Sequence, residues 1–333
     1  MNKYIFISSA LLLLSTACVK EEEMDSSHTE PMKFDSFVEQ GTKAVGSKLE
    51  DINSTMGVWG YKFKKGTSPT SSQYFPIFQS QTMSQSQIVS FENNSWVYTP
   101  QRYWDSTCDY HFYAISPHSL DATCYFNEGK LWINEFRVNS NIEDQVDVLI
   151  AARKDITSPQ AVEFVFTHVL ARVNFKLQSG IPAYGSDADG NPLYETIEVT
   201  RITLRDVFCQ GICGFTLTEN KVNVHEWGYK QTDGILYDSY TKSFTPAVNL
   251  SYKGETKDGM MNLFLIPWPT SDVRLDIEYK VGDVEFSKSD ILLPESINSW
   301  KPNVNYTYTL VLNPYGAPIS FGPIETGSWA TEY

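Results

Sequence analysis

The most regular alternation of apolar and polar residues in this chain lies within residues 162–177. Apolar side chains occupy every second position over residues 162–166 and again over residues 171–177. A period of two is typical of a half-buried β-strand, so each part predicts a strand. Between the parts, at residues 168–170, the phase of the alternation changes, and such a change exchanges the two faces of a strand. We therefore expect a bulge, a sharp bend or a change of sheet there, with His168 as a structural histidine at that corner.

Further short apolar segments with turn residues between them indicate strands along most of the chain. They cover residues 32–37, 57–63, 96–98, 103–104, 110–115, 131–138 and 146–152 before the central stretch, and residues 197–207, 212–217, 222–227, 261–266, 273–281, 284–293 and 304–312 after it. This spacing is typical of β-sandwiches, and no long segment after residue 18 has helical periodicity. Residues 153–160 are polar and include Pro159, which indicates a domain junction. We thus predict an all-β protein with an N-terminal sandwich domain over residues 34–157 and a C-terminal one over residues 158–333.

The N-terminus has the pattern of a lipoprotein export signal. A basic residue precedes an apolar run over residues 5–14, which is too short to span a bilayer, and small residues then lead to Cys18. We predict a signal peptide over residues 1–17 and a diacylglycerol on the sulfur of Cys18, although Ser15 stands where such signals more often carry leucine. Residues 18–33 are acidic and have few core-forming side chains, which predicts a flexible tether. This tether carries a lysine followed by three glutamates, similar to signals that direct lipoproteins to the outer leaflet of the outer membrane; an ordinary solvated tether is the alternative.

Charge and motifs exclude several classes of function. The formal net charge of the 333 residues is −14 at pH 7, without a cluster of Lys and Arg, so nucleic acid is excluded as a partner. The chain carries no nucleophile elbow, phosphate-binding loop or zinc-protease helix, and its five histidines are scattered. The stretch from Asp187 to Asn191 resembles a calcium loop, but Pro192 stands where that loop needs glycine, so a hairpin turn is the better interpretation. We predict no enzyme activity, no cofactor and no metal.

Four cysteines besides Cys18 form two pairs that are close in the sequence, Cys108 with Cys124 and Cys209 with Cys213. An exported protein reaches an oxidising compartment, so disulfides within these pairs are one alternative. Free buried thiols are the other. The spacing of Cys209 and Cys213 does not fit a usual zinc site.

Residues 166–177 resemble the central sequence of the fimbrillin-like lipoproteins, the type V pilins. Three other stretches resemble that family in the same order: residues 56–61, residues 96–104 with 110–114, and residues 292–329. The resemblance covers most of residues 35–333 and implies a transthyretin-like Greek-key fold for both sandwiches. It also implies a structural subunit, whether shaft, tip or anchor, of a cell-surface fimbria that supports adhesion. The implied partners are other copies or related pilins, a processing protease, and the outer membrane through the lipid anchor.

The resemblance further implies joining by strand exchange. In that family the C-terminal strands leave their own subunit and fill a groove on the next one, after a protease removes the N-terminal strand. Matched to this chain, the donor segment comprises residues 303–312 and residues 319–329. Its inward-facing residues would be Val304, Tyr306, Tyr308, Leu310, Leu312, Ile319, Phe321 and Trp329. Such strand addition joins subunits head to tail.

The processing site departs from the family's pattern. Members of the best-known subgroup are cut after an arginine, but the first arginine here is Arg102, inside the first predicted domain. We expect cleavage after Lys43, with Lys48 and Lys33 as alternatives. A subunit that is never cut and stays lipidated as an anchor is a rival interpretation.

A glycan-binding outer-membrane surface lipoprotein, with a host or glycan surface as its ligand, is an alternative from a different class. Aromatic rings that face solvent can stack on sugar rings. The candidate rings belong to Trp96, Tyr103, Trp104, Trp227 and Trp268.

Overall fold

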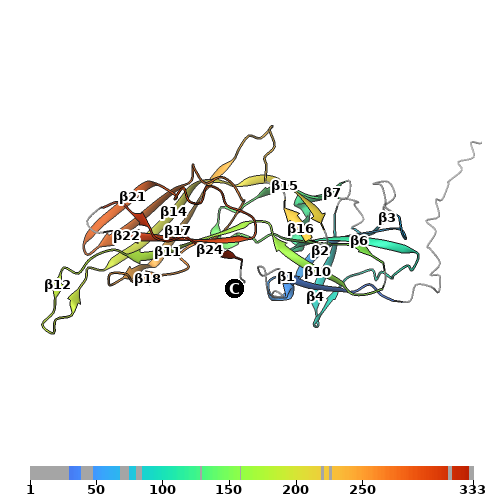
Figure 1. Ribbon diagram of the computed structural model, residues 1–333, viewed down its shortest axis with the longest axis horizontal. Coiled ribbons are helices and arrows are strands. Elements are labelled where there is room, and N and C mark those ends of the chain that lie inside the picture. Colours follow the sequence, from blue (N-terminus) through green and yellow to red (C-terminus); the bar gives the residue numbers. More distant parts are fainter. Residues whose placement is uncertain are drawn as a thin grey trace, which may run out of the picture.

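A computed structural model of the protein describes residues 30–38, 48–67, 75–79, 85–127, 130–157, 159–218, 221–224, 227–313 and 317–329. In these residues the regular elements are β-strands and three short 3-10 helices, η2 (Leu49–Asp51), η4 (His118–Thr123) and η5 (Ile142–Asp144). The all-β prediction is therefore confirmed. The strands form two sandwiches that lie end to end along the long axis of the molecule (Figure 1).

The first sandwich combines an eight-stranded sheet with a four-stranded sheet. The larger sheet has the order β1-β10-β9-β6-β2-β4-β5, with β3 also paired to β2. Its strands are β1 (Phe34–Val38), β2 (Thr55–Lys64), β3 (Phe75–Phe78), β4 (Gln87–Glu92), β5 (Ser95–Val97), β6 (Cys108–Ser116), β9 (Leu149–Ile156) and β10 (Val162–His168). The smaller sheet has the order β16-β15-β8-β7. It contains β7 (Cys124–Asn127), β8 (Lys130–Arg137), β15 (Gln210–Thr218) and β16 (Lys221–Val224).

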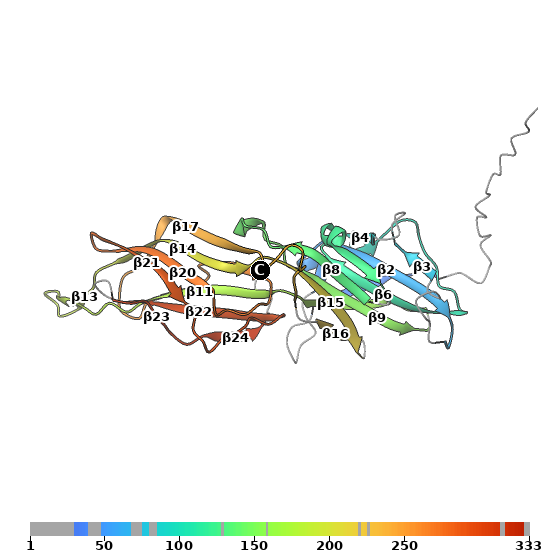
Figure 2. The same ribbon diagram turned by 90° about the horizontal axis from the view of Figure 1, so that it is seen from above.

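The second sandwich consists of a six-stranded and a four-stranded sheet, which appear as separate layers in Figure 2. The six-stranded sheet contains β11 (Ala171–Ser179), β18 (Thr256–Lys257), β19 (Asn262–Leu265), β22 (Val304–Leu312), β23 (Ser320–Phe321) and β24 (Glu325–Ser328). The four-stranded sheet has the order β17-β14-β20-β21 and contains β14 (Ile197–Phe208), β17 (Tyr237–Leu250), β20 (Arg274–Val281) and β21 (Val284–Leu292). A hairpin of β12 (Gly185–Ser186) and β13 (Pro192–Leu193) extends from one end (Figure 1).

The change of phase in the central stretch is a change of sheet. β10 belongs to the eight-stranded sheet of the first sandwich, and β11 belongs to the six-stranded sheet of the second. Val169 and Leu170, which connect them, have no exposed surface. The chain therefore passes through the core where it crosses from one sandwich to the other, and of the three alternatives predicted there, a change of sheet is confirmed.

Sheet membership does not follow the predicted domain boundary between residues 157 and 158. β10 lies after that boundary but pairs with β9 and β1. β15 and β16 lie still further along the chain, yet they complete the smaller sheet of the first sandwich by pairing with β8. Of the polar stretch over residues 153–160, the first four residues are the end of β9, and the chain then returns as β10, the antiparallel neighbour of β9 in the same sheet.

The eight-stranded sheet is apolar on both faces. On one face Trp59, Ile115 and Ile150 join the large core that continues into the second sandwich. On the other face, Val58 and Phe164 belong to a separate core, which also contains the buried side chains of β1. A sheet with both faces covered reads as a continuous apolar run, and β2 has this pattern over residues 56–61.

Candidate functional site

Among the described strands β1 pairs only with β10, so it lies at the edge of its sheet. The two strands are parallel, with Phe34 opposite Val162 and Val38 opposite Phe166. Phe37 of β1 also forms an isolated bridge with Lys48, and Pro31, which precedes the strand, forms one with Tyr103. Because β1 lies at the edge, its departure would leave the other strand pairs of the sheet intact.

The side chains of β1 hold it in the smaller of the two cores. Phe34 is 4% exposed and stacks on Phe164, with ring centroids 5.7 Å apart and planes 14° from parallel. It also makes edge contacts with Phe78, at 5.2 Å, and with Phe112, at 6.0 Å. Met32 and Val38 are buried on the same face. Removal of β1 would therefore open an apolar groove along β10.

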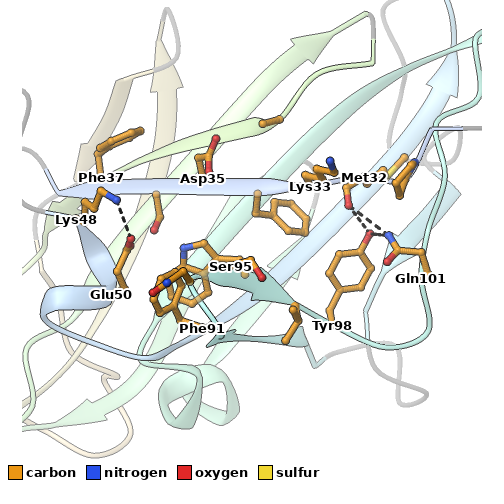
Figure 3. A pocket seen from close by; sticks show the side chains of 17 residues that line it. Met32, Lys33, Asp35, Phe37, Lys48, Glu50, Phe91, Ser95, Tyr98 and Gln101 are labelled. Atoms are coloured by element: carbon orange, nitrogen blue, oxygen red, sulfur yellow. Dashed lines mark hydrogen bonds and ion pairs between the residues drawn. The ribbon is translucent and has the colours of Figure 1, made fainter.

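An elongated pocket lies along the outer edge of β1, between this strand and the β4–β5 hairpin (Figure 3). At one end the Tyr98 hydroxyl donates to the Met32 carbonyl over 2.8 Å. Burial raises the pKa of the Tyr98 phenol to about 12, so the hydroxyl keeps the proton that it donates. At the other end the Lys48 ammonium lies 3.5 Å from the Glu50 carboxylate. Sequence reasoning missed this pocket, because its two walls are 60 residues apart in the chain.

The C-terminal strands occupy two different environments. β22 is central in its own sheet, since it pairs with β11 over eight residues on one side and with β23 and β24 on the other. Its residues Tyr306, Tyr308, Leu310 and Leu312 are buried on one face, and Val304 is half-buried. β23 and β24 lie beyond it at the margin of the sheet. The predicted alternation of the first donor stretch is therefore present, but these side chains fill the core of their own sandwich.

The last described residue, Trp329, is 1% exposed and packs at the junction of the two sandwiches. Its indole stacks on the His168 ring, with centroids 4.2 Å apart, and on the Phe264 ring, at 5.4 Å. His168 Nδ1 lies 2.7 Å from Asp147 Oδ2, and both side chains are buried. His168 is therefore the structural histidine that the sequence indicated. Asp147 was not predicted, because its partner is 21 residues away and no local pattern marks it.

The two covalent sites predicted near the N-terminus, Cys18 and Lys43, lie outside the described residues. Of the alternative cleavage sites, Lys33 precedes β1 in the sequence and Lys48 follows it, and both are exposed. A cut after Lys33 leaves β1 attached to the rest of the chain, whereas a cut after Lys48 frees it.

The cysteines Cys108, Cys124, Cys209 and Cys213 are all free thiols in the structure, so neither sequence-local pair forms a disulfide there. The Cys209 thiol donates to the Leu236 carbonyl and the Cys213 thiol to the Gly214 carbonyl. Burial, the largest influence, raises the pKa of the Cys209 thiol.

Three of the aromatic rings that we expected at the surface are instead buried. Trp96 is 8% exposed, Trp104 4% and Trp227 5%, whereas Tyr103 is 39% exposed and Trp268 is partly buried. The Trp227 indole donates to the Val169 carbonyl inside the core. Trp96 lies in the edge strand β5, between exposed Ser95 and Val97, whereas Trp104 and Trp227 lie in connections between strands. They offer no open stacking platform for a sugar.

Within the described residues, no three His, Cys, Asp or Glu side chains come together as metal ligands. Asp187 instead caps a hairpin turn, since its Oδ1 accepts from the backbone N–H of Asp189 and of Asn191. The hairpin interpretation of that stretch is confirmed. Among all the residues that the structure describes, no helix is long and apolar enough to cross a bilayer.

Comparison with known proteins shows which family the sequence matches and which solved structures have a similar fold. A sequence model described as fimbrillin-like matches residues 42–329. The fold is similar to that of a fimbrial protein from Bacteroides vulgatus, with a TM-score of 0.59 and 17% identity over 90% of this chain and 100% of the other. A candidate cell adhesion protein from Bacteroides ovatus is also similar, with a TM-score of 0.51 and 13% identity over 91% and 99% of the two chains. A search of curated protein sequences gave no match.

Proposed function

Because the chain belongs to the fimbrillin-like family, whose members are structural proteins rather than enzymes, we propose that it is a subunit of a cell-surface fimbria that joins its neighbours by strand exchange. The observation that carries the proposal is the position of β1. It is a five-residue strand at the edge of its sheet, with its apolar side chains inserted into a separate core. A strand so placed can be replaced by another without rebuilding the sandwich.

The energy of this insertion is large enough for a durable joint. Met32, Phe34 and Val38 are buried, and each such side chain contributes about 1.5–3 kcal/mol. Together they supply roughly 5–9 kcal/mol before the cost of ordering the incoming segment. Backbone pairing along β10 adds to this and is independent of sequence.

The donor in this proposal is the segment of residues 317–329. It carries β23 and β24, which lie at the margin of their sheet, whereas the loss of the central β22 would divide that sheet. The two positions Ile319 and Phe321 have the same spacing as Met32 and Phe34 in the acceptor. We propose that Phe321 of one subunit takes the place of Phe34 in the next, among Phe78, Phe112 and Phe164. Val304 and the other inward-facing residues of β22 would then remain in the core of their own subunit and hold the donor segment to it.

Maturation would precede joining. We propose that Cys18 carries the lipid that holds the precursor at the outer membrane, and that cleavage after Lys43 separates β1 and its anchor from the body. Lys48 remains a workable alternative, but Lys33 does not, because a cut there leaves β1 in the chain. The N-terminal sequence of fimbriae sheared from cells decides between cleavage after Lys43 and cleavage after Lys48. We expect Ala44 as the first residue.

Polymerisation of purified protein tests the joining step. Protein cut in the segment between β1 and η2 should form ladders of oligomers. A copy that ends at residue 316 keeps β22 but has no donor, so it should bind to one end of the growing polymer and shorten it. Cut protein that stays monomeric, or polymers whose length ignores the shortened copy, would contradict strand exchange.

A further inference from the structure

The chain just before β1 is held to the first sandwich by hydrogen bonds to its main-chain atoms. The Met32 N–H donates to the Arg102 carbonyl over 2.9 Å, and the Trp104 N–H donates to the Glu30 carbonyl over 3.1 Å. The Met32 carbonyl in turn accepts from the Tyr98 hydroxyl over 2.8 Å (Figure 3). Because these bonds use only the backbone of the incoming segment, another strand that follows the same path can form them too.

The Tyr98 side chain is fixed by groups that do not belong to β1. Its ring lies edge-on to Phe78, with centroids 4.9 Å apart. Its hydroxyl accepts from the Gln101 amide over 2.7 Å and from the Arg102 N–H over 3.4 Å. We therefore expect the hydroxyl to keep its position when β1 leaves the groove.

The residues around this contact have a counterpart in the donor segment. Residues 31–34 are Pro-Met-Lys-Phe, and residues 318–321 are Pro-Ile-Ser-Phe. Of the sixteen prolines in the chain, only Pro31 and Pro318 are followed by phenylalanine at the third position after them. The two segments thus share a proline, an apolar residue, a polar residue and a phenylalanine in the same order.

We propose that Tyr98 is a positioning residue for strand exchange, and that its hydroxyl sets the register of the donor by binding the Ile319 carbonyl of a second copy. That carbonyl takes the place of the Met32 carbonyl. Phe34 follows Met32 by two residues, and Phe321 follows Ile319 by two, so one register satisfies both the hydroxyl and the aromatic pocket. This inference rests on the proposed function and adds the alignment that strand exchange requires.

A proline after the shared segment agrees with this register. The Val162 N–H donates to the Lys33 carbonyl, and in a parallel pair the residues that bond to the neighbouring strand alternate with residues that face away from it. Ser36 is one of those that face away from β10. Pro323 takes the place of Ser36, so its missing N–H breaks no bond to β10. A shift by one residue would put this proline where an N–H must donate.

The same register limits how far the donor enters the groove. Val38 has no exposed surface, and Glu325 would take its place. Burial of a carboxylate without a partner is very costly. The donor should therefore leave the groove before Glu325, so that only its first residues lie along β10.

Disulfide trapping between copies reads the register. The pairing of β1 with β10, continued by one residue, places Lys33 beside Ala161, so Ser320 of the donor should lie there. Neighbouring strands are about 4.8 Å apart, and residues two positions apart are about 6.6 Å apart along a strand. Glu163 is then about 8 Å from Ser320, beyond the reach of a disulfide. In polymers with Ser320→Cys, made in a Cys108→Ser background, Ala161→Cys should cross-link about tenfold or more faster than Glu163→Cys.

Tyr98→Phe tests the hydroxyl itself. It keeps the ring against Phe78 and removes the hydrogen bond to the donor carbonyl. Loss of one such bond shifts an equilibrium roughly two- to tenfold, so the ratio of the two cross-links should fall by that factor. A general loss of stability would weaken both cross-links alike and leave their ratio unchanged. Tyr103→Phe is the matched control, since this ring is 39% exposed beside the same end of β1, and it should not change the ratio.

Each outcome has a definite meaning. Equal cross-linking at the two acceptor positions, or a ratio that Tyr98→Phe does not change, would refute the role of Tyr98 and leave strand exchange in place. Cross-linking mainly at Glu163 would refute the register. Cut protein that never polymerises would refute both proposals, because no joint would exist whose register could be set.

Discussion

The imidazole of His168 lies flat against the indole of Trp329, with their planes 7° from parallel. His168 is the last residue of β10 in the first sandwich, and Trp329 follows β24, the last strand of the second. The C-terminal segment is therefore fastened at the junction of the two sandwiches. Any release of that segment must first break this contact.

Trp329→Ala should loosen the C-terminal segment. Loss of a fully buried indole costs about 3–5 kcal/mol, and here the lost indole directly follows β24, at the margin of its sheet. We expect faster hydrogen exchange at the amides of β24, with little change in β22. Trp329→Phe keeps a ring against His168, so its β24 amides should exchange at a rate between those of the parent protein and of Trp329→Ala. Equal exchange in all three proteins would show that the stack does not hold the segment.

Lys43→Ala should prevent maturation if the cut falls after Lys43. The precursor would accumulate with its N-terminal segment attached, and mass spectrometry of surface protein would detect it. Lys33→Ala is the matched control, because cleavage there cannot free β1. Normal processing of Lys43→Ala together with a block in Lys48→Ala would transfer the assignment to Lys48.

Phe34→Ala should weaken the docking of β1 by about 3–5 kcal/mol, because the ring is surrounded by Phe78, Phe112 and Phe164. Hydrogen exchange of the β1 amides should accelerate well before global unfolding. Asp35→Ala changes the exposed neighbour and should have an effect below about 0.5 kcal/mol. Similar effects of the two substitutions would contradict the assignment of Phe34 as the anchor.

Phe321→Asp should abolish joining while the monomer stays folded. The ring is only partly buried in its own subunit, where it lies edge-on to Tyr308 at 6.3 Å. In the acceptor groove a carboxylate would have no partner, and its burial there would be very costly. Ser320→Asp, one residue earlier and exposed, should permit polymers. Oligomer ladders on gels after cleavage give the readout, and ladders with Phe321→Asp would eliminate this residue as a donor.

Stability should fall as the pH falls from 7 to 5, in part through His111. Burial lowers the pKa of His111 below its usual 6.5, and the hydrogen bond to Asp155 offsets this only in part. The unfolded chain therefore binds the proton first, so the folded state loses stability as the pH drops through 6.5. His111→Gln should reduce the slope by up to about 1.4 kcal/mol per pH unit in urea unfolding. Asp155→Asn should enlarge the loss of stability at low pH, because it removes the charge that raises the pKa of His111.

Sequence pattern predicted the strands well where only one face of a strand is buried. β20 and β11 alternate strictly, and the phase change near His168 marked the crossing between sheets. Pairing partners were not predictable in this way. The stretch over residues 210–224 reads like any other strand pair, and only tertiary contacts place it in the first sandwich. The pocket along β1 could not be predicted for the same reason. Ser36 and Trp96 line it together although their strands, β1 and β5, stand at opposite ends of the strand order of the sheet.

β15 and β16 return to the first sandwich after β11 to β14 have entered the second, so the described strands require the chain to pass between the two bodies three times. A pulling force applied to the ends of the molecule is then carried by three covalent spans in parallel instead of one. The subunit should bend little at its middle and resist extension as a stiff rod. For a thread exposed to flowing liquid, the weakest point would then be the joint between molecules.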